Sequence, residues 1–101
     1  MNIYLVCNAG MSTSILVAKM QEEAKKQNLD VNIEAFSVEI LDEKIASADV
    51  ILIGPQIRHM VPQIEKIVSG KCPTTVIDMR DYGLINGANV LKKALELINA
   101  K

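Results

Sequence analysis

Short apolar runs alternate along this chain with longer stretches of helical period. Residues 3–6 and 50–53 are continuously hydrophobic, which is typical of parallel strands that are buried on both faces. Residues 31–35 alternate between apolar and polar side chains and predict a half-exposed strand at a sheet edge. Residues 74–77 are short and β-branched, and predict a fourth strand.

Helical patterns separate these strands. From about residue 13 to residue 27, Leu16, Met20 and Ala24 recur every four positions and predict an amphipathic helix. Weaker or shorter helices are predicted over 41–48, 57–68 and 90–98. Pro62 should kink or restart the second of these, because proline lacks the N–H of a helix interior.

The alternation of strands and helices predicts a three-layer α/β sandwich, with helices on both faces of a four-stranded parallel sheet. Right-handed crossovers favour the strand order 2-1-3-4, which flavodoxin-like proteins and cysteine phosphatases share. With no linker, repeat or low-complexity segment, residues 1–101 are predicted to form a single domain. Ligands in such folds bind beyond the carboxyl ends of the strands, where segments 7–14, 54–59 and 78–83 should meet.

The composition narrows the class of function. The net charge of −1 argues against binding to nucleic acid or to a membrane surface, which requires a basic field. No apolar run approaches the roughly 20 residues that a membrane span requires, and the first residues lack the basic region of a signal peptide. Cysteines at positions 7 and 72 are then expected to be reduced thiols in a cytoplasmic protein.

One segment carries recognisable chemistry: a cysteine at a strand end, a loop of small residues and a cluster of hydroxyls that opens a helix. Backbone N–H groups at a helix start form a cradle for an anion, and their positive potential favours the nucleophilic thiolate. An inert, buried cysteine is the alternative interpretation. The predicted phosphate-handling segment consists of Cys7, Asn8, Ala9, Gly10, Met11, Ser12, Thr13 and Ser14.

Other phosphate and cofactor motifs do not match. The chain has no Gly-Lys-Ser/Thr of a nucleotide-binding loop and no Gly-x-Gly-x-x-Gly of a dinucleotide site. Cys7, His59 and Cys72 lack the paired spacing of zinc ligands, so neither a metal nor a cofactor is predicted.

Low-molecular-weight cysteine phosphatases and related arsenate reductases are the nearest enzymatic alternative. Their strand-loop-helix carries Cys-x5-Arg, in which the arginine clamps the transferring phosphoryl group. Here Thr13 stands in the position of that arginine, and the first basic residue after Cys7 is Lys19. A phosphocysteine without this cation should hydrolyse slowly, which favours a phosphoryl carrier over a hydrolase.

Residues 4–14 closely resemble the phosphocysteine loop of the IIB component of the bacterial sugar phosphotransferase system, lactose/cellobiose class. The resemblance covers essentially the whole chain. It continues through residues 33–36, 49–56, 60–62, 76–78, 82–83 and 90–92.

This resemblance implies a phosphoryl relay. A phosphohistidine on the IIA component donates to Cys7, residues 8–14 bind the phosphate, and phospho-Cys7 donates to a disaccharide held by the membrane component IIC. Stand-alone proteins of this length resemble the cellobiose and N,N'-diacetylchitobiose members. The resemblance implies no metal in this component, and we expect a monomer that binds IIA and IIC transiently.

A few further polar residues fall in the same segments. Gln56 stands at a strand end and is a candidate to donate to the phosphoryl group. Arg58 is either a phosphate or partner contact or a rim charge, His59 is expected to face solvent, and Asp81 is expected to be a turn residue. A non-catalytic regulatory or redox module of the same fold is a third possibility for the whole chain, and it predicts an oxidisable Cys7.

Overall fold

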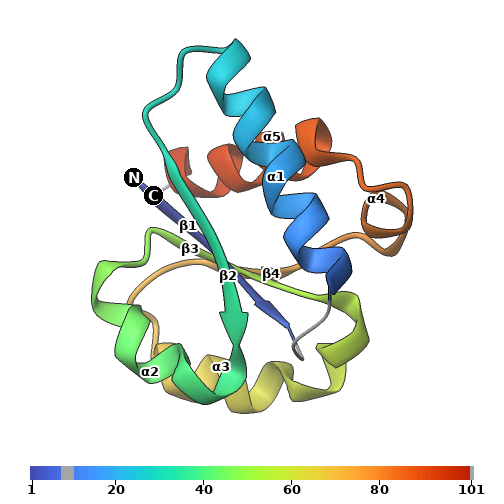
Figure 1. The fold of residues 1–101 in the computed structure, drawn as a ribbon. Helices are drawn as coiled ribbons and strands as arrows, with labels where there is room; N and C mark the ends of the chain where they lie inside the picture. The colour runs from blue at the N-terminus through green and yellow to red at the C-terminus, as the bar shows by residue number, and fades with distance from the viewer. Residues whose placement is uncertain (8–10, 101) are drawn as a thin grey trace.

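The computed structural model describes residues 1–7 and 11–100, without the side chains of Met11 and Ser12. Its four strands form one parallel sheet in the order β2-β1-β3-β4 (Figure 1). This confirms the predicted fold class and strand order. The strands are β1 (Asn2–Cys7), β2 (Asn32–Ser37), β3 (Val50–Ile53) and β4 (Thr74–Val76).

Helices cover both faces of the sheet, which gives the three predicted layers (Figure 1). One face carries α1 (Met11–Lys26) and α5 (Gly87–Asn99), and the other carries α2 (Leu41–Lys44) and α3 (Val61–Val68). A short helix, α4 (Met79–Gly83), lies beyond the end of β4. Short 3-10 turns cover Val38–Ile40, Ile45–Ser47 and Pro55–Met60.

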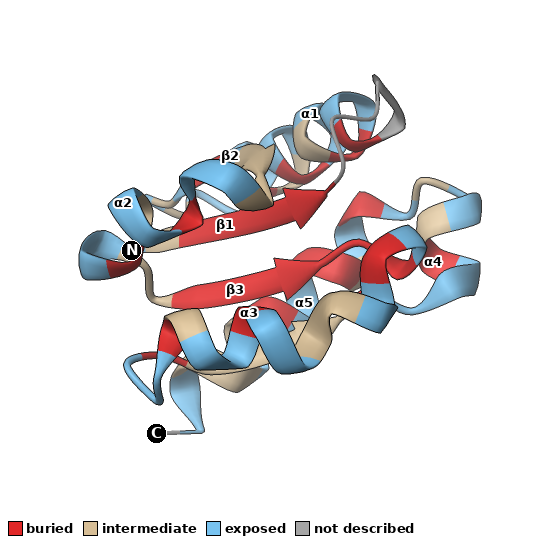
Figure 2. Cartoon of the chain, turned by 90° about the horizontal axis from the view of Figure 1, so that it is seen from below, coloured by how far each residue is buried: buried red, intermediate tan, exposed pale blue. Residues whose placement is uncertain are grey.

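The continuous apolar runs supply two cores at once, because successive side chains of a strand point to opposite faces. In β1, Ile3 and Leu5 join the core under α1 and α5, whereas Tyr4 and Val6 join the core on the opposite face. β3 divides its side chains in the same way, and both strands are buried apart from Asn2, the half-buried first residue of β1 (Figure 2).

Two boundaries differ from the prediction. α1 begins at Met11, two residues before the predicted start at about residue 13, so Met11 and Ser12 belong to the helix. Gly10 is the last residue before α1 that disfavours a helix, which explains the early start. The predicted turn at Asp81 is wrong as well, because Asp81 lies in α4. Pro62 does restart a helix, and it sits in the first turn of α3, where a missing N–H costs nothing.

No helix in the described ranges is both long and apolar enough to cross a membrane.

Gly87 allows α5 to approach α1 closely. A Cβ atom at this position would lie 2.7 Å from the carbonyl carbon and from the Cβ of Lys19, and 2.8 Å from the backbone nitrogen of Met20. These neighbours are mostly backbone atoms, which cannot move without displacing α1.

We therefore expect Gly87→Ala to lower the free energy of unfolding by about 1–3 kcal/mol, as overpacking does in a close-packed core. Gly83→Ala is the matched control. A Cβ at Gly83 meets nothing within 4 Å, so this change should be neutral or slightly stabilising. Urea unfolding of both variants measures the difference, and equal midpoints would contradict the close approach of the helices.

Candidate functional site

Cys7 is the last residue of β1, at the carboxyl edge of the sheet. It pairs in register with Ser37 of β2, and only 4% of its surface is exposed. On the β3 side, the backbone N–H of Gly54 donates to the carbonyl oxygen of Val6 over 2.9 Å. A Cβ at Gly54 would lie only 3.5 Å from the Cβ of Cys7. The thiol therefore lies beside the point between β1 and β3 at which flavodoxin-like folds bind ligands.

The amino end of α1 lies close to Cys7 along the chain. This 16-residue helix begins at Met11, four residues after the cysteine. Its first N–H groups have no partners within the helix and carry a partial positive charge. Of the predicted phosphate-binding residues, Asn8, Ala9 and Gly10 lie outside the described residues.

Thr13 and Ser14 occupy different environments in the first turn of α1. Thr13 is 1% exposed, and its hydroxyl oxygen lies 3.1 Å from the hydroxyl oxygen of Tyr82 in α4. Ser14 is exposed at the surface. The Thr13 hydroxyl therefore contacts α4, whereas the Ser14 side chain faces solvent.

Gln56 follows β3 and lies against Gly54. Its Oε1 atom is 2.7 Å from the position that a Gly54 Cβ would take, and its Nε2 donates to the Tyr82 hydroxyl. Cys7, Gln56 and Tyr82 belong to the three segments that the sequence predicted to meet at the carboxyl edge. The contacts at Gly54 and at Tyr82 bring these segments together.

Two carboxylates hold α4 in place. Asp78 caps the helix by accepting hydrogen bonds from the backbone N–H groups of Arg80 (2.9 Å) and Asp81 (3.2 Å). The bond from Asp81, followed by that from Arg80, stabilises the carboxylate and lowers the pKa of Asp78 below its ordinary value.

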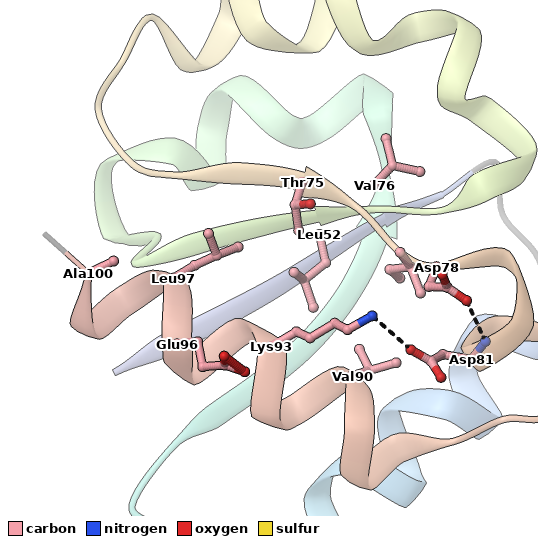
Figure 3. A pocket seen from close by; sticks show the side chains of 11 residues that line it. Leu52, Thr75, Val76, Asp78, Asp81, Val90, Lys93, Glu96, Leu97 and Ala100 are labelled. Carbon is pink, nitrogen blue, oxygen red and sulfur yellow. Dashed lines mark hydrogen bonds and ion pairs between the residues drawn. The ribbon is translucent and has the colours of Figure 1, made fainter.

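Asp81 is a buried residue of α4 and not the turn residue that the sequence predicted. Its carboxylate accepts from the side-chain amide of Asn89 (2.7 Å) and pairs with the ammonium of Lys93 (3.3 Å), both on α5. Figure 3 shows this ion pair at the wall of a cavity of about 620 Å³ between β4 and α5. Leu52, Val90 and Leu97 line the same cavity, whereas Cys7 and Gln56 do not.

The other candidates contribute little to this geometry. Arg58 and His59 are both exposed, and for His59 this agrees with the prediction. Within the described parts of the chain, no three His, Cys, Asp or Glu side chains come together to hold a metal ion.

Sequence reasoning did not single out Tyr82. Its hydroxyl joins Thr13 and Gln56, from two other elements, at the edge that carries Cys7. A signal was present, because Tyr82 is one of only three aromatic residues (two Tyr and one Phe) and falls in a segment predicted to reach the site.

The sheet order and the flanking helices define a flavodoxin-like α/β protein with a cysteine at the end of its first strand. The same fold occurs in an arginine phosphatase variant whose active-site serine is phosphorylated, with a TM-score of 0.55 and 16% identity over 97% of this chain and 91% of that one.

Comparison with known proteins identifies the family. The family model for the lactose/cellobiose-specific IIB subunit of the PTS system matches residues 2–93. A galactose-specific EIIB component from Lactococcus lactis subsp. cremoris and a cellobiose-specific one from Lactococcus lactis subsp. lactis are each 41% identical, over 96% of this chain and 95% of theirs. The solution structure of a cellobiose-specific IIB protein from Borrelia burgdorferi has a TM-score of 0.86 and 42% identity, and covers 100% of this chain and 94% of its own.

The chain belongs to the lactose/cellobiose-specific IIB family, which confirms the resemblance noted from the sequence. It is accordingly a sugar-specific EIIB component, a class of phosphotransferase.

The cap at Asp78 makes a pH-dependent contribution to stability. The folded protein lowers the pKa of Asp78 below its ordinary value of 3.8, so the ionised carboxylate stabilises the fold at every pH above 3.8. This stabilisation is lost as the pH falls through the lower pKa of the folded protein. We expect Asp78→Ala to unfold at lower urea concentration than the native chain at about pH 7, and the difference to shrink as the pH falls below 3.8, because the protonated carboxyl caps α4 more weakly than the carboxylate does.

Asp78→Asn is the matched control, since its amide oxygen can still cap α4 but does not titrate. The gap in urea midpoint between Asp78→Asn and Asp78→Ala should not shrink on acidification. A constant gap between the native chain and Asp78→Ala over the same range would contradict the role of the carboxylate.

Proposed function

We propose that Cys7 is the phosphoryl carrier of this IIB component. It receives a phosphoryl group from a phosphohistidine of IIA and passes the group to a disaccharide of the cellobiose or diacetylchitobiose class during uptake through IIC. The observation that carries the proposal is the position of Cys7 at the carboxyl end of β1, four residues before the amino end of α1 and directly beside Gly54.

The first transfer moves the phosphoryl group from the donor histidine of IIA to Cys7. The thiolate of Cys7 attacks phosphorus, and the N–P bond to the donor histidine breaks. The electron pair of that bond stays on the imidazole nitrogen, and the proton released by the thiol neutralises it. In the second transfer a sugar hydroxyl attacks phosphorus and the S–P bond breaks. The electron pair of that bond stays on sulfur as the thiolate, and the hydroxyl proton passes to solvent or to that thiolate.

Residues 8–14 are the proposed phosphate-binding segment. Phosphoryl transfer requires mainly positioning and charge stabilisation, which backbone N–H groups at a loop and at a helix start provide. The phosphoryl group adds a charge of about −1.5 to −2 to a chain of net charge −1, so these N–H groups should order around it. Gln56, whose side chain lies against Gly54, is a further candidate donor.

The lack of a basic residue in this segment favours a carrier over a phosphatase. No Lys or Arg occurs between Cys7 and Lys19, and Lys19 lies about 12 Å along the axis of α1 from its first residue. Without the arginine that the cysteine phosphatases carry in this segment, attack by water loses the stabilisation of its transition state that this cation supplies. The phosphocysteine can then persist until the sugar arrives.

The partners follow from the family. IIA and IIC are the proposed donor and acceptor components, met in turn by a monomeric, cytoplasmic protein. The relatives are named for galactose, cellobiose and oligo-β-mannoside, so the sugar is proposed only as a class. We expect selection among these sugars to occur mainly on IIC.

Cys7→Ala should abolish phosphoryl acceptance, because alanine offers no nucleophile. Cys72→Ala is the matched control, since it removes the other buried cysteine and should keep acceptance. Each protein is incubated with phosphorylated IIA of the cellobiose class, and intact-mass spectrometry reports whether one phosphoryl group is gained. Acceptance by Cys7→Ala, or none by the native chain, would contradict the proposal.

A further inference from the structure

The hydroxyl of Tyr82 joins the elements that surround Cys7. It lies 3.1 Å from the Thr13 hydroxyl in the first turn of α1, and it accepts a hydrogen bond from the Gln56 amide after β3. Thr13 and Tyr82 are 69 positions apart in the chain, so the contact is a product of the fold. One phenolic oxygen thus connects α1, α4 and the segment that follows β3.

The Gln56 contact extends this connection to Cys7. Gly54 has no side chain, and the Gln56 amide oxygen lies 2.7 Å from the place that a Cβ would take there. That place is 3.5 Å from the Cβ of Cys7. The hydrogen bond to Tyr82 therefore fixes the Gln56 side chain against Gly54, the residue that neighbours Cys7 across the sheet.

Bonds that do not involve the phenol hold the backbone of Tyr82. Asp78 caps α4, and the buried Asp81 forms an ion pair with Lys93 of α5 (Figure 3). Asp81 also accepts a hydrogen bond from the side-chain amide of Asn89 of α5. Removing the hydroxyl alone should consequently leave α4 where it is. The hydroxyl positions the first turn of α1 and Gln56, while the fold itself does not depend on it.

We infer that Tyr82 is a positioning residue for phosphoryl transfer at Cys7. Its hydroxyl holds the first turn of α1 in place relative to the thiol. The free N–H groups of that turn donate hydrogen bonds to the phosphoryl oxygens. This inference rests on the function proposed above. Phosphoryl transfer is sensitive to such placement, because the attacking and leaving atoms must be aligned.

The chain offers a matched control in Tyr4. Its hydroxyl lies 2.8 Å from the Ser47 hydroxyl, and Ser47 precedes β3 at the opposite edge of the sheet. Tyr4→Phe and Tyr82→Phe each remove one phenolic hydroxyl that meets an aliphatic hydroxyl. Only Tyr82→Phe removes it at the edge that carries Cys7.

The experiment measures the rate of phosphoryl transfer from phosphorylated IIA of the cellobiose class to the native chain and to each variant, over a range of donor concentration. We expect Tyr82→Phe to lower the maximal rate about three- to tenfold and to leave the half-saturating donor concentration unchanged. Thr13→Val should give a similar loss, and the double variant should be no slower than either single variant. Tyr4→Phe should transfer at the native rate.

The results separate this inference from the proposed function. If the native chain accepts no phosphoryl group, the proposed function fails. If the native chain accepts it and Tyr82→Phe keeps the native maximal rate, the positioning role of Tyr82 is wrong. An equal loss in Tyr4→Phe, or a change confined to the half-saturating donor concentration, would also overturn it, since these outcomes indicate general destabilisation or a docking role.

Discussion

The parallel pairing of β1 with both β2 and β3 is the constraint on which the site depends. Parallel strands end at one edge, so the segments after β1, β3 and β4 meet there however far apart they lie in the chain. This pairing puts Gly54 beside Cys7 and brings Gln56 to Tyr82. The two apolar cores on either side of β1 hold that edge in register, because a shifted strand would move its side chains to the wrong face.

The side chains that meet at the Tyr82 hydroxyl are neutral, whereas the cysteine phosphatases carry an arginine in the segment that follows their cysteine. Thr13, Gln56 and Tyr82 are all uncharged, and the described carboxylate nearest to them in sequence, Asp81, is held by α5 at a separate cavity. Such an arrangement suits a group that is received and passed on, since a strong electrostatic clamp would speed its loss to water.

The hydrophobic pattern along the chain predicted the strands, because the burial of a strand is visible in its own residues. The uninterrupted runs at 3–6 and 50–53 identified the central strands, and Cys7 followed from its place at the end of the first. The helix α4 could not be predicted, because its five residues depend on the Asp78 cap and on the tie from Asp81 to α5. The link between Thr13 and Tyr82 and the close approach of Gly87 to α1 are likewise distant in sequence, and no pattern along the chain encodes them.

The most direct test follows the phosphoryl group after it has reached Cys7. The chain is labelled with radioactive phosphate through IIA, freed of donor, and mixed with membranes that contain IIC of the cellobiose class, with and without cellobiose. A carrier predicts that the label leaves the cysteine rapidly as sugar phosphate only when sugar and IIC are present, and otherwise stays bound. Release as inorganic phosphate at the same rate with and without sugar would contradict the carrier and indicate a phosphatase.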